Sequence, residues 1–373
     1  MKRILHVLGA MNQGGVETWL MHMLRTIDRT RFELEFAVHT GRPAFYDSEI
    51  RSLGSRLHIC AEPHRPLQYG AGFLRLLKEQ GPYDVVHSHV HHYSGVVLKL
   101  ASHAGVPNRI AHSHNDKSTV EADAGFARKA YLRLMKHWVS RYATKGFAAS
   151  EPAARDLFGR EWKKNKKWSL LYCAIDLAPF ELPASRSAVR RELAIPEAAF
   201  VIGHVGRFDP QKNHAYLVEV LAELAKIEPD VMGLLIGRGS LREDVQKKAK
   251  RLGLAEKIRF AEDRTDIARL MTGAMDLFLF PSLYEGLPLA LLEAQAAGLP
   301  CVISNAIAED AEVVGSLIRR IDLKDGAGKW AREIARIRKT LPLLSRADAL
   351  RKMRRSSFDI SSSIRAIERN YEI

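Results

Sequence analysis

The sequence predicts an α/β protein built from two domains, each containing a parallel sheet. Short β-branched or apolar runs alternate with amphipathic helical patterns along almost the whole chain, which is typical of βαβ units. The alternation breaks once, between about residues 176 and 199, where three prolines interrupt a weakly apolar stretch. The length of 373 residues favours the same division, because single cores of this size are uncommon.

The individual elements follow from these periodicities. In the first half, strands are expected at residues 3–8, 32–39, 57–60, 84–89, 109–114 and 145–149. In the second half, strands are expected at residues 201–205, 233–236, 258–260, 276–280 and 301–304. Helices fill the gaps, and in the first of them Val16, Leu20 and Leu24 share one face. Only helices are expected after Asp325.

We therefore place an N-terminal domain at residues 1–180 and a C-terminal domain at residues 181–356. A last helix within residues 357–373 is assigned to the N-terminal domain. Because ligands of open α/β sheets bind beyond the carboxyl ends of the strands, functional residues are expected in the loops that follow strands.

Composition limits the class of protein. Apolar residues make up 46% of the chain and charged residues 27%, and no apolar run reaches the length of about 18 residues that a membrane-spanning helix needs. Three isolated cysteines without metal-ligand spacing favour the cytoplasm. A net charge of +14 implies an anionic partner, which could be nucleic acid, acidic lipid or a phosphorylated substrate.

Two glycine-containing loops are candidates for binding phosphate. Gly14 and Gly15 follow the first strand and open a helix, so their backbone N–H groups could face an anion; the alternative is a turn that needs positive φ. After the strand at residues 201–205, Arg207 and Lys212 could converge on a diphosphate, or could be two surface cations. Gly237, at the end of the next strand, would let the backbone approach a nucleotide.

The most specific motif follows the apolar strand at residues 276–280. It places Glu285 in a loop and Glu293 in the next helix, where the carboxylates could accept hydrogen bonds from sugar hydroxyls. The loop amides of Gly286 and Leu287 could face an anion. The alternative is a loop glutamate and a solvated helix glutamate, but an unpaired carboxylate in so apolar a helix as that of Glu293 would be costly.

Histidines gather at two neighbouring strand ends. In an extended segment His87, His89 and His91 would share a face, and His112 and His114 follow on the next strand. A zinc site is the less favoured interpretation, because no nearby cysteine completes a ligand set. We prefer a phosphate or sugar cleft lined by imidazoles.

Taken together, these residues resemble the GT-B glycosyltransferases of retaining family 4, which include bacterial exopolysaccharide and capsule glycosyltransferases. The resemblance runs from Gly14 to about Ser304 and is most specific at residues 285–300. It implies two Rossmann-like domains that face each other across a cleft, a nucleotide-sugar donor (a UDP-sugar is favoured), and retention of the anomeric configuration. It also implies no cofactor and no metal.

The resemblance assigns roles to the candidate residues. Glu285 would contact the hydroxyls of the transferred sugar and Glu293 those of the ribose, while Gly286 and Leu287 lie in the same motif. The pair that neutralises the donor diphosphate would be Arg207 and Lys212. The remaining assignments are Gly14 and Gly15 near the phosphates and acceptor, and His114 near the transferred sugar.

Two basic stretches, residues 128–141 and 160–168, combine Lys and Arg with Trp and Tyr. This pattern suits an anionic membrane surface, and a lipid-diphosphate-linked acceptor would give it a purpose. A solvated basic face is the open alternative, and no nucleic-acid partner is expected because no binding module is recognisable. The expected location is the cytoplasm, at the inner face of the membrane.

The expected function is sugar transfer from a nucleotide-diphosphate sugar to a glycan or lipid-linked acceptor in surface polysaccharide biosynthesis. Two alternatives remain open. One is a non-hydrolysing nucleotide-sugar epimerase of the same architecture, and the other is a non-catalytic scaffold that binds a nucleotide sugar.

Overall fold

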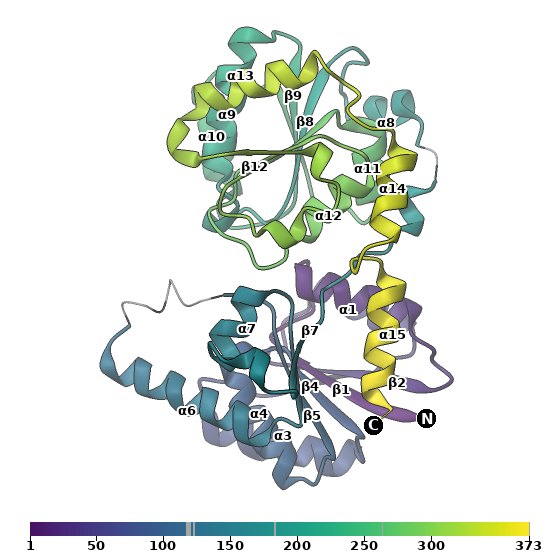
Figure 1. Ribbon diagram of the computed structural model, residues 1–373, viewed down its shortest axis with the longest axis vertical. Helices are drawn as coiled ribbons and strands as arrows, with labels where there is room; N and C mark the ends of the chain where they lie inside the picture. The colour runs from purple at the N-terminus through teal and green to yellow at the C-terminus, as the bar shows by residue number, and fades with distance from the viewer. Residues whose placement is uncertain (117–120, 122–123, 183, 263, 373) are drawn as a thin grey trace. The chain divides into compact units, whose positions relative to one another are not determined.

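The computed structural model describes residues 1–116, 121, 124–182, 184–262 and 264–372, which form two compact units (Figure 1). Unit 1 contains residues 1–174 and the C-terminal segment from Ile360, and unit 2 contains Ile175–Asp359. The first boundary lies at residue 174 and not at the predicted 180, because Ile175 belongs to unit 2. Its backbone N–H donates to the Phe358 carbonyl at 2.9 Å, and it forms a parallel bridge with Asp359.

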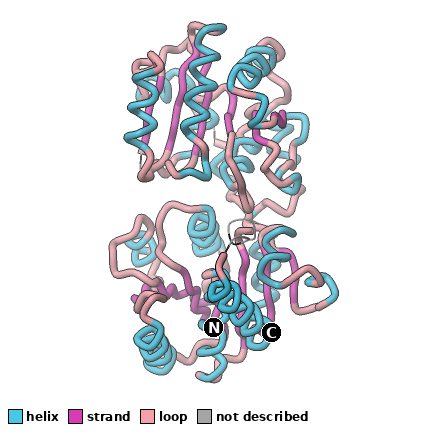
Figure 2. Tube along the Cα trace, turned by 90° about the vertical axis from the view of Figure 1, so that its left-hand side faces the viewer, coloured by secondary structure: helices cyan, strands magenta, loops and turns pink. Residues whose placement is uncertain are grey.

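Unit 1 is a seven-stranded parallel sheet in the order β3-β2-β1-β4-β5-β6-β7. Its strands are β1 (Lys2–Leu8), β2 (Phe32–Val38), β3 (Leu57–Ile59), β4 (Val85–Ser88), β5 (Asn108–Ser113), β6 (Lys145–Ala148) and β7 (Trp168–Leu170). Its helices are α1 (Gly15–Thr26), α2 (Asp47–Ser52), α3 (Pro66–Gln80), α4 (Ser94–His103), α6 (Phe126–Tyr142) and α7 (Glu151–Phe158), with 3-10 turns η1 (His91–Tyr93) and η2 (Trp162–Lys164). Figure 2 shows helices on both sides of the strands, so both sheet faces are covered.

The last helix, α15 (Ile360–Tyr371), packs on unit 1, as expected from the sequence, and brings the two chain ends to the same unit (Figure 1). The indole N–H of the buried Trp19 in α1 donates to Ser363 at 3.3 Å. The hydroxyl of Tyr371 lies 2.7 Å from Nδ1 of His87 at the end of β4. These buried contacts tie the end of the chain to the core of the first unit.

Unit 2 is a six-stranded parallel sheet in the order β10-β9-β8-β11-β12-β13. Its strands are β8 (Phe200–Val205), β9 (Val231–Ile236), β10 (Ile258–Ala261), β11 (Leu277–Phe280), β12 (Cys301–Ser304) and β13 (Ile318–Ile321). Its helices are α8 (Arg186–Glu192), α9 (His214–Ile227), α10 (Arg242–Arg251), α11 (Ile267–Ala274), α12 (Leu289–Ala296), α13 (Ala327–Arg338) and α14 (Arg346–Arg354). Short 3-10 turns are η3 (Ala178–Phe180), η4 (Pro210–Lys212), η5 (Glu309–Ala311), η6 (Gly315–Leu317) and η7 (Leu323–Asp325).

Both units therefore have the strand order of Rossmann-like folds, with the chain reversing direction across the sheet between β1 and β4 and between β8 and β11. The predicted fold class of two Rossmann-like domains is confirmed. Two outer strands, β7 and β13, were not expected from the sequence. β13 reads Ile-Arg-Arg-Ile and lies at the sheet edge, where only one side pairs and the arginines stay accessible. None of the described helices combines the length and apolar character needed to cross a bilayer.

Candidate active site

The loop between β8 and α9 folds Lys212 back toward the end of the neighbouring strand. The carboxylate of Asp209 accepts a hydrogen bond from the backbone N–H of Lys212 at 3.3 Å and so caps η4. Asn213 takes the left-handed conformation, with φ of 54°, which turns the chain directly into α9. As a result the Lys212 ammonium lies 4.9 Å from the ring centre of Phe280, the last residue of β11.

The structure brings together two of the predicted site residues. Nζ of Lys212 lies 2.6 Å from Oε1 of Glu285, and the two side chains are only 15% and 4% exposed. The Gln211 amide donates to the other oxygen of Glu285 at 2.9 Å and to the Tyr284 carbonyl at 3.0 Å. The loop after β8 and the loop after β11 are thus locked to each other through a nearly buried, charge-assisted pair.

Glu293 lies on the second turn of α12, whose N-terminus at Pro288 has no side-chain cap. The Glu293 carboxylate is partly buried and forms no hydrogen bond or ion pair with the described residues, and desolvation raises its pKa to about 7. The backbone N–H groups of Gly286 and Leu287 likewise donate to no other described residue. An acceptor carboxylate and free amides therefore lie along the same loop and helix.

The glycines after β8 and β9 are there because two backbones touch. A Cβ on Gly237, whose φ is +143°, would lie 2.2 Å from the Gly206 carbonyl oxygen. One on Gly239, whose φ is +155°, would lie 2.3 Å from the carbonyl oxygen of Phe208. Gly237 thus brings the end of β9 against the loop that carries Lys212.

Arg207 is the predicted residue that the structure leaves outside this cluster. Its side chain is 61% exposed, and its guanidinium contacts Asp209 at 3.3 Å. No contact joins it to Lys212 or Glu285 among the described residues. Its place next to Gly206 still puts it on the loop that carries Lys212.

Two buried histidines beneath this loop were missed by the sequence analysis. His204 is the penultimate residue of β8, and His214 begins α9. Their ring centres lie 4.6 Å apart, and His214 stacks on Phe208 at 3.9 Å. Burial, with Lys212 nearby, lowers the pKa of His204 to about 4 and that of His214 to about 2. The rings are therefore neutral and add no second positive charge beside Lys212. The signal available in the sequence was a histidine inside an otherwise apolar strand.

In unit 1, Gly14 and Gly15 form the N-terminus of α1, as predicted. Gly14 has φ of −157°, which any residue can adopt, so the alternative of a turn that needs positive φ is wrong. A Cβ there would lie 2.3 Å from Oε2 of Glu17, the far end of a flexible side chain that can move aside. The Gly14 carbonyl accepts the first helical hydrogen bond, from Thr18 at 2.8 Å.

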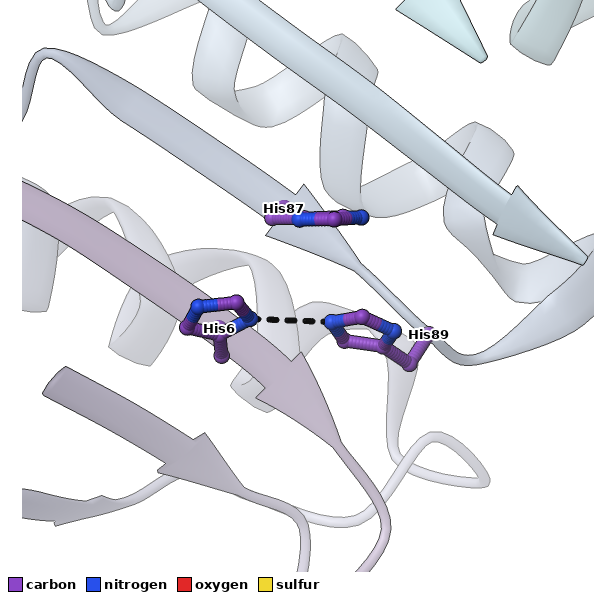
Figure 3. Close-up of side chains that lie close together, drawn as sticks. All are labelled: His6, His87 and His89. Carbon is purple, nitrogen blue, oxygen red and sulfur yellow. Dashed lines mark hydrogen bonds between the residues drawn. The ribbon is translucent and has the colours of Figure 1, made fainter. Parts of the chain in front are cut away.

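His114 belongs to a group of five imidazoles, which we call the histidine layer, on one face of the unit 1 sheet. Its members are His6, His87, His89, His112 and His114. Figure 3 shows three of them, at β1 and the end of β4, with the 3.0 Å hydrogen bond between Nδ1 of His6 and Nε2 of His89. Burial lowers the pKa of His6 and of His114 to about 3, so these rings are neutral at pH 7.

The predicted common face of His87, His89 and His91 is wrong at its third member. β4 ends at Ser88, and His91 takes a left-handed conformation with φ of 51° in η1. Its Nε2 lies 3.2 Å from the carboxylate of the buried Asp156 in α7. The alternating geometry of a strand stops before His91, so its side chain joins a different group.

Comparison with known proteins identifies the class that this fold and site define. Residues 14–166 match the model of the glycosyl transferase 4-like domain, and residues 185–346 match that of glycosyl transferases group 1. The chain therefore belongs to the group 1 glycosyltransferases and is a glycosyltransferase enzyme.

Individual relatives agree with this membership. The Bacillus subtilis (strain 168) protein EpsF, named as a glycosyltransferase, is 37% identical over 90% of this chain and 87% of its own. The Staphylococcus aureus protein CapH, named as a capsular polysaccharide biosynthesis glycosyltransferase, is 30% identical over 84% of each chain. The crystal structure of Anabaena HepE in complex with UDP-glucose superposes with a TM-score of 0.80 at 20% identity, covering 100% of both chains. That similarity supports the GT-B fold; the roles of the individual site residues stay predictions.

Proposed function

We propose that this glycosyltransferase moves a sugar from a nucleotide-diphosphate sugar, with a UDP-sugar favoured, to a glycan or lipid-linked acceptor in surface polysaccharide biosynthesis. The observation that carries the proposal is the Lys212–Glu285 pair, set beside the free amides of Gly286 and Leu287. A diphosphate requires positive charge and N–H donors, whereas a sugar requires carboxylate acceptors. The loops after β8 and β11 supply both. The name of CapH supports a role in polysaccharide biosynthesis, and the HepE complex with UDP-glucose supports the donor.

The proposed chemistry is charge stabilisation during departure of the nucleoside diphosphate. The bond between the anomeric carbon and the diphosphate oxygen breaks, and the acceptor oxygen bonds the same carbon on the same face. Because the new bond forms on the same face, the configuration is retained without an enzyme nucleophile. The acceptor's proton passes to the departing phosphate. Lys212, the loop amides and Arg207 would hold the developing negative charge in place of a metal ion at the diphosphate.

Glu285 and Glu293 would hold the sugars of the donor. Glu285 already presents two acceptor oxygens, held by Lys212 and Gln211, to the loop after β11. Glu293 keeps a partly buried carboxylate that no other described residue pairs with, and such a group is costly unless a ligand completes its hydrogen bonds. Ribose hydroxyls are suitable donors for it.

A peripheral position on an anionic membrane surface is part of the proposal, and α6 supports it. The helix carries exposed apolar side chains, Phe126 at 87% and Leu134 at 45%, beside basic ones. Its basic residues are Arg128, Lys129, Arg133, Lys136, His137 and Arg141. Basic side chains beside exposed apolar ones suit the headgroup region of a cytoplasmic leaflet, where a lipid-diphosphate acceptor would lie.

A ligand screen followed by turnover assays tests the proposal. UDP-, GDP- and ADP-sugars are each added to the purified chain; a donor present at ~100 times its Kd stabilises the protein by about 2.7 kcal/mol and raises Tm. Transfer to an added acceptor with retention, seen by NMR of the product, supports the proposed reaction. Epimerised donor without acceptor consumption points to the epimerase, and binding without turnover points to the scaffold. No stabilisation by any donor contradicts all three.

A further inference from the structure

The histidine layer places polar rings where a parallel sheet ordinarily carries aliphatic side chains. Four of its rings are buried, and His89 is partly exposed. Burial, reinforced by the neighbouring imidazoles, also lowers the pKa of His87, His89 and His112 well below the ordinary value. Each neutral ring therefore offers one N–H and one lone pair.

Rings of this kind can satisfy one another only along a directed chain of N–H···N hydrogen bonds. Nε2 of His114 lies 2.9 Å from Nδ1 of His89, and Nε2 of His89 lies 3.0 Å from Nδ1 of His6. In a second link, Nε2 of His87 lies 3.2 Å from Nδ1 of His112. These hydrogen bonds leave one imidazole nitrogen of the histidine layer unsatisfied.

That nitrogen is Nε2 of His112, which is buried and has no hydrogen-bond partner among the described residues. The backbone of Leu171 acts to raise the pKa of His112 but does not complete a hydrogen bond to its Nε2. A buried polar nitrogen left unsatisfied costs about 1–3 kcal/mol. Such an atom, close to the ring nitrogens of His89 and His114, calls for a ligand.

The geometry points to a metal site formed by His89, His112 and His114, for a cation that prefers imidazole nitrogen, such as Zn²⁺ or Cu⁺. One nitrogen from each of these rings lies within 4.8 Å of the other two. Ligands of a tetrahedral ion with bonds of about 2.05 Å are roughly 3.3 Å apart, so the 2.9 Å pair opens by only ~0.4 Å. This site departs from the expectation that the chain holds no metal.

The surroundings of the three rings match those of metal-binding histidines, whose second nitrogen has its own hydrogen-bond partner. With a metal on Nδ1 of His89 and on Nε2 of His112 and His114, the opposite nitrogens keep their protons. His89 then donates to His6, and His112 donates to His87. His114 presents its Nδ1–H to the sulfur of the buried Cys173 at 3.4 Å.

Two other groups of potential ligands fit a metal less well. His6, His87 and His89 also lie within reach of one another, but both nitrogens of His87 already have partners, Tyr371 and His112. The group of His91, His92 and Asp156 has its carboxylate paired with the Lys136 ammonium at 3.1 Å. Nε2 of His92 is also buried without a hydrogen-bond partner among the described residues, so the orphaned nitrogen of His112 alone does not decide; the paired carboxylate of Asp156 favours the group of His89, His112 and His114.

Metal titration of the full-length protein tests the site without using glycosyl transfer. Metal-free protein is titrated with Zn²⁺, and anaerobically with Cu⁺, each against a chromophoric chelator. We expect one equivalent of at least one ion to bind, at least about tenfold more weakly in His112→Gln. The matched control, His64→Gln, changes a histidine that is 63% exposed and should bind as the wild type does. Circular dichroism and thermal unfolding check that both variants are folded.

X-ray absorption of the metal-loaded wild type needs no variant, so it decides the question even if His112→Gln fails to fold. The expected spectrum has about three imidazole nitrogens in the first shell. Binding weaker than about 0.1 mM for both ions, a first shell without imidazole, or equal affinity in a folded His112→Gln variant would overturn the site. Because none of these readouts depends on a sugar donor, failure here leaves the proposed glycosyl transfer untouched.

Discussion

Lys212 and Glu285 can be changed singly and together to measure how strongly they depend on each other. At 2.6 Å, opposite unit charges attract with roughly 6 kcal/mol at an effective dielectric constant of 20. Loss of hydration offsets most of this, because the side chains are only 15% and 4% exposed. We therefore expect a net coupling of about 1–3 kcal/mol in the free energy of unfolding.

The variants are Lys212→Met, Glu285→Gln and the double change. Each single change leaves one partner of a nearly buried pair without its counter-charge, so the double variant should lose less stability than the sum of the singles. Each single change should also lower kcat/KM by ~100-fold or more, about 2.7 kcal/mol of transition-state stabilisation. The double variant should be little slower than either single, because groups that act as a unit are not additive.

Denaturant unfolding gives one double-mutant cycle, in stability, and initial-rate kinetics gives a second one, in activity. The matched control is the Lys226–Glu223 pair, which has a similar separation of 2.7 Å but side chains that are 68% and 41% exposed. Its coupling should stay below about 0.5 kcal/mol, with wild-type activity. A Lys212–Glu285 coupling no larger than that of the control, or full activity in both single variants, would show that the two side chains do not act as a pair.

Three further outcomes are expected. The folded-state pKa of Glu293 is about 7, so its buried charge destabilises the protein fully above pH 7 and not at all below pH 4.5. Glu293→Gln should therefore raise the free energy of unfolding at pH 8 by up to about 3 kcal/mol, measured by denaturant unfolding. The same change should weaken nucleotide binding. His6 and His114 gain protons below about pH 6.5 in the unfolded chain but only near pH 3 in the folded protein. The free energy of unfolding should therefore decrease by about 1.4 kcal/mol per ring for each unit by which the pH is lowered between these values. A free energy of unfolding that stays constant between pH 6.5 and 4.5 would count against neutral buried rings. Changing the exposed Lys129 and Arg133 to Gln should weaken binding to anionic vesicles by roughly 30-fold. Co-sedimentation measures this binding, and zwitterionic vesicles are the control. Unchanged binding would remove α6 from the membrane proposal.

Most of the fold could be predicted because buried parallel strands leave a strong signal. Strands such as Leu277–Phe280 and Val231–Ile236 are buried on both faces, so nearly every residue in them is apolar. β7 and β13 lack this signal, since a three-residue strand beside a basic stretch and an edge strand with two arginines bury too little. The first domain boundary was misplaced because the pairing of Ile175 with Phe358 and Asp359 joins residues far apart in sequence.

The candidate site was predicted residue by residue but not as an arrangement. Spacing after strands placed Lys212 and Glu285 at the same sheet edge, yet their contact depends on the left-handed Asn213 and on the loop geometry. The histidine layer was half visible, because alternation along one strand joins His87 to His89. The contribution of His6 depends on the register between β1 and β4, which periodicity along a single strand does not contain.

A crystal structure of the chain with bound UDP-glucose, or with whichever nucleotide sugar raises Tm most, is the most direct test of how the donor is held. We expect diphosphate oxygens within hydrogen-bond distance of the Lys212 ammonium and of the amides of Gly286 and Leu287, with the ribose hydroxyls bound to Glu293. A donor bound in unit 2 away from these groups, or a diphosphate held by residues of unit 1 alone, would contradict it.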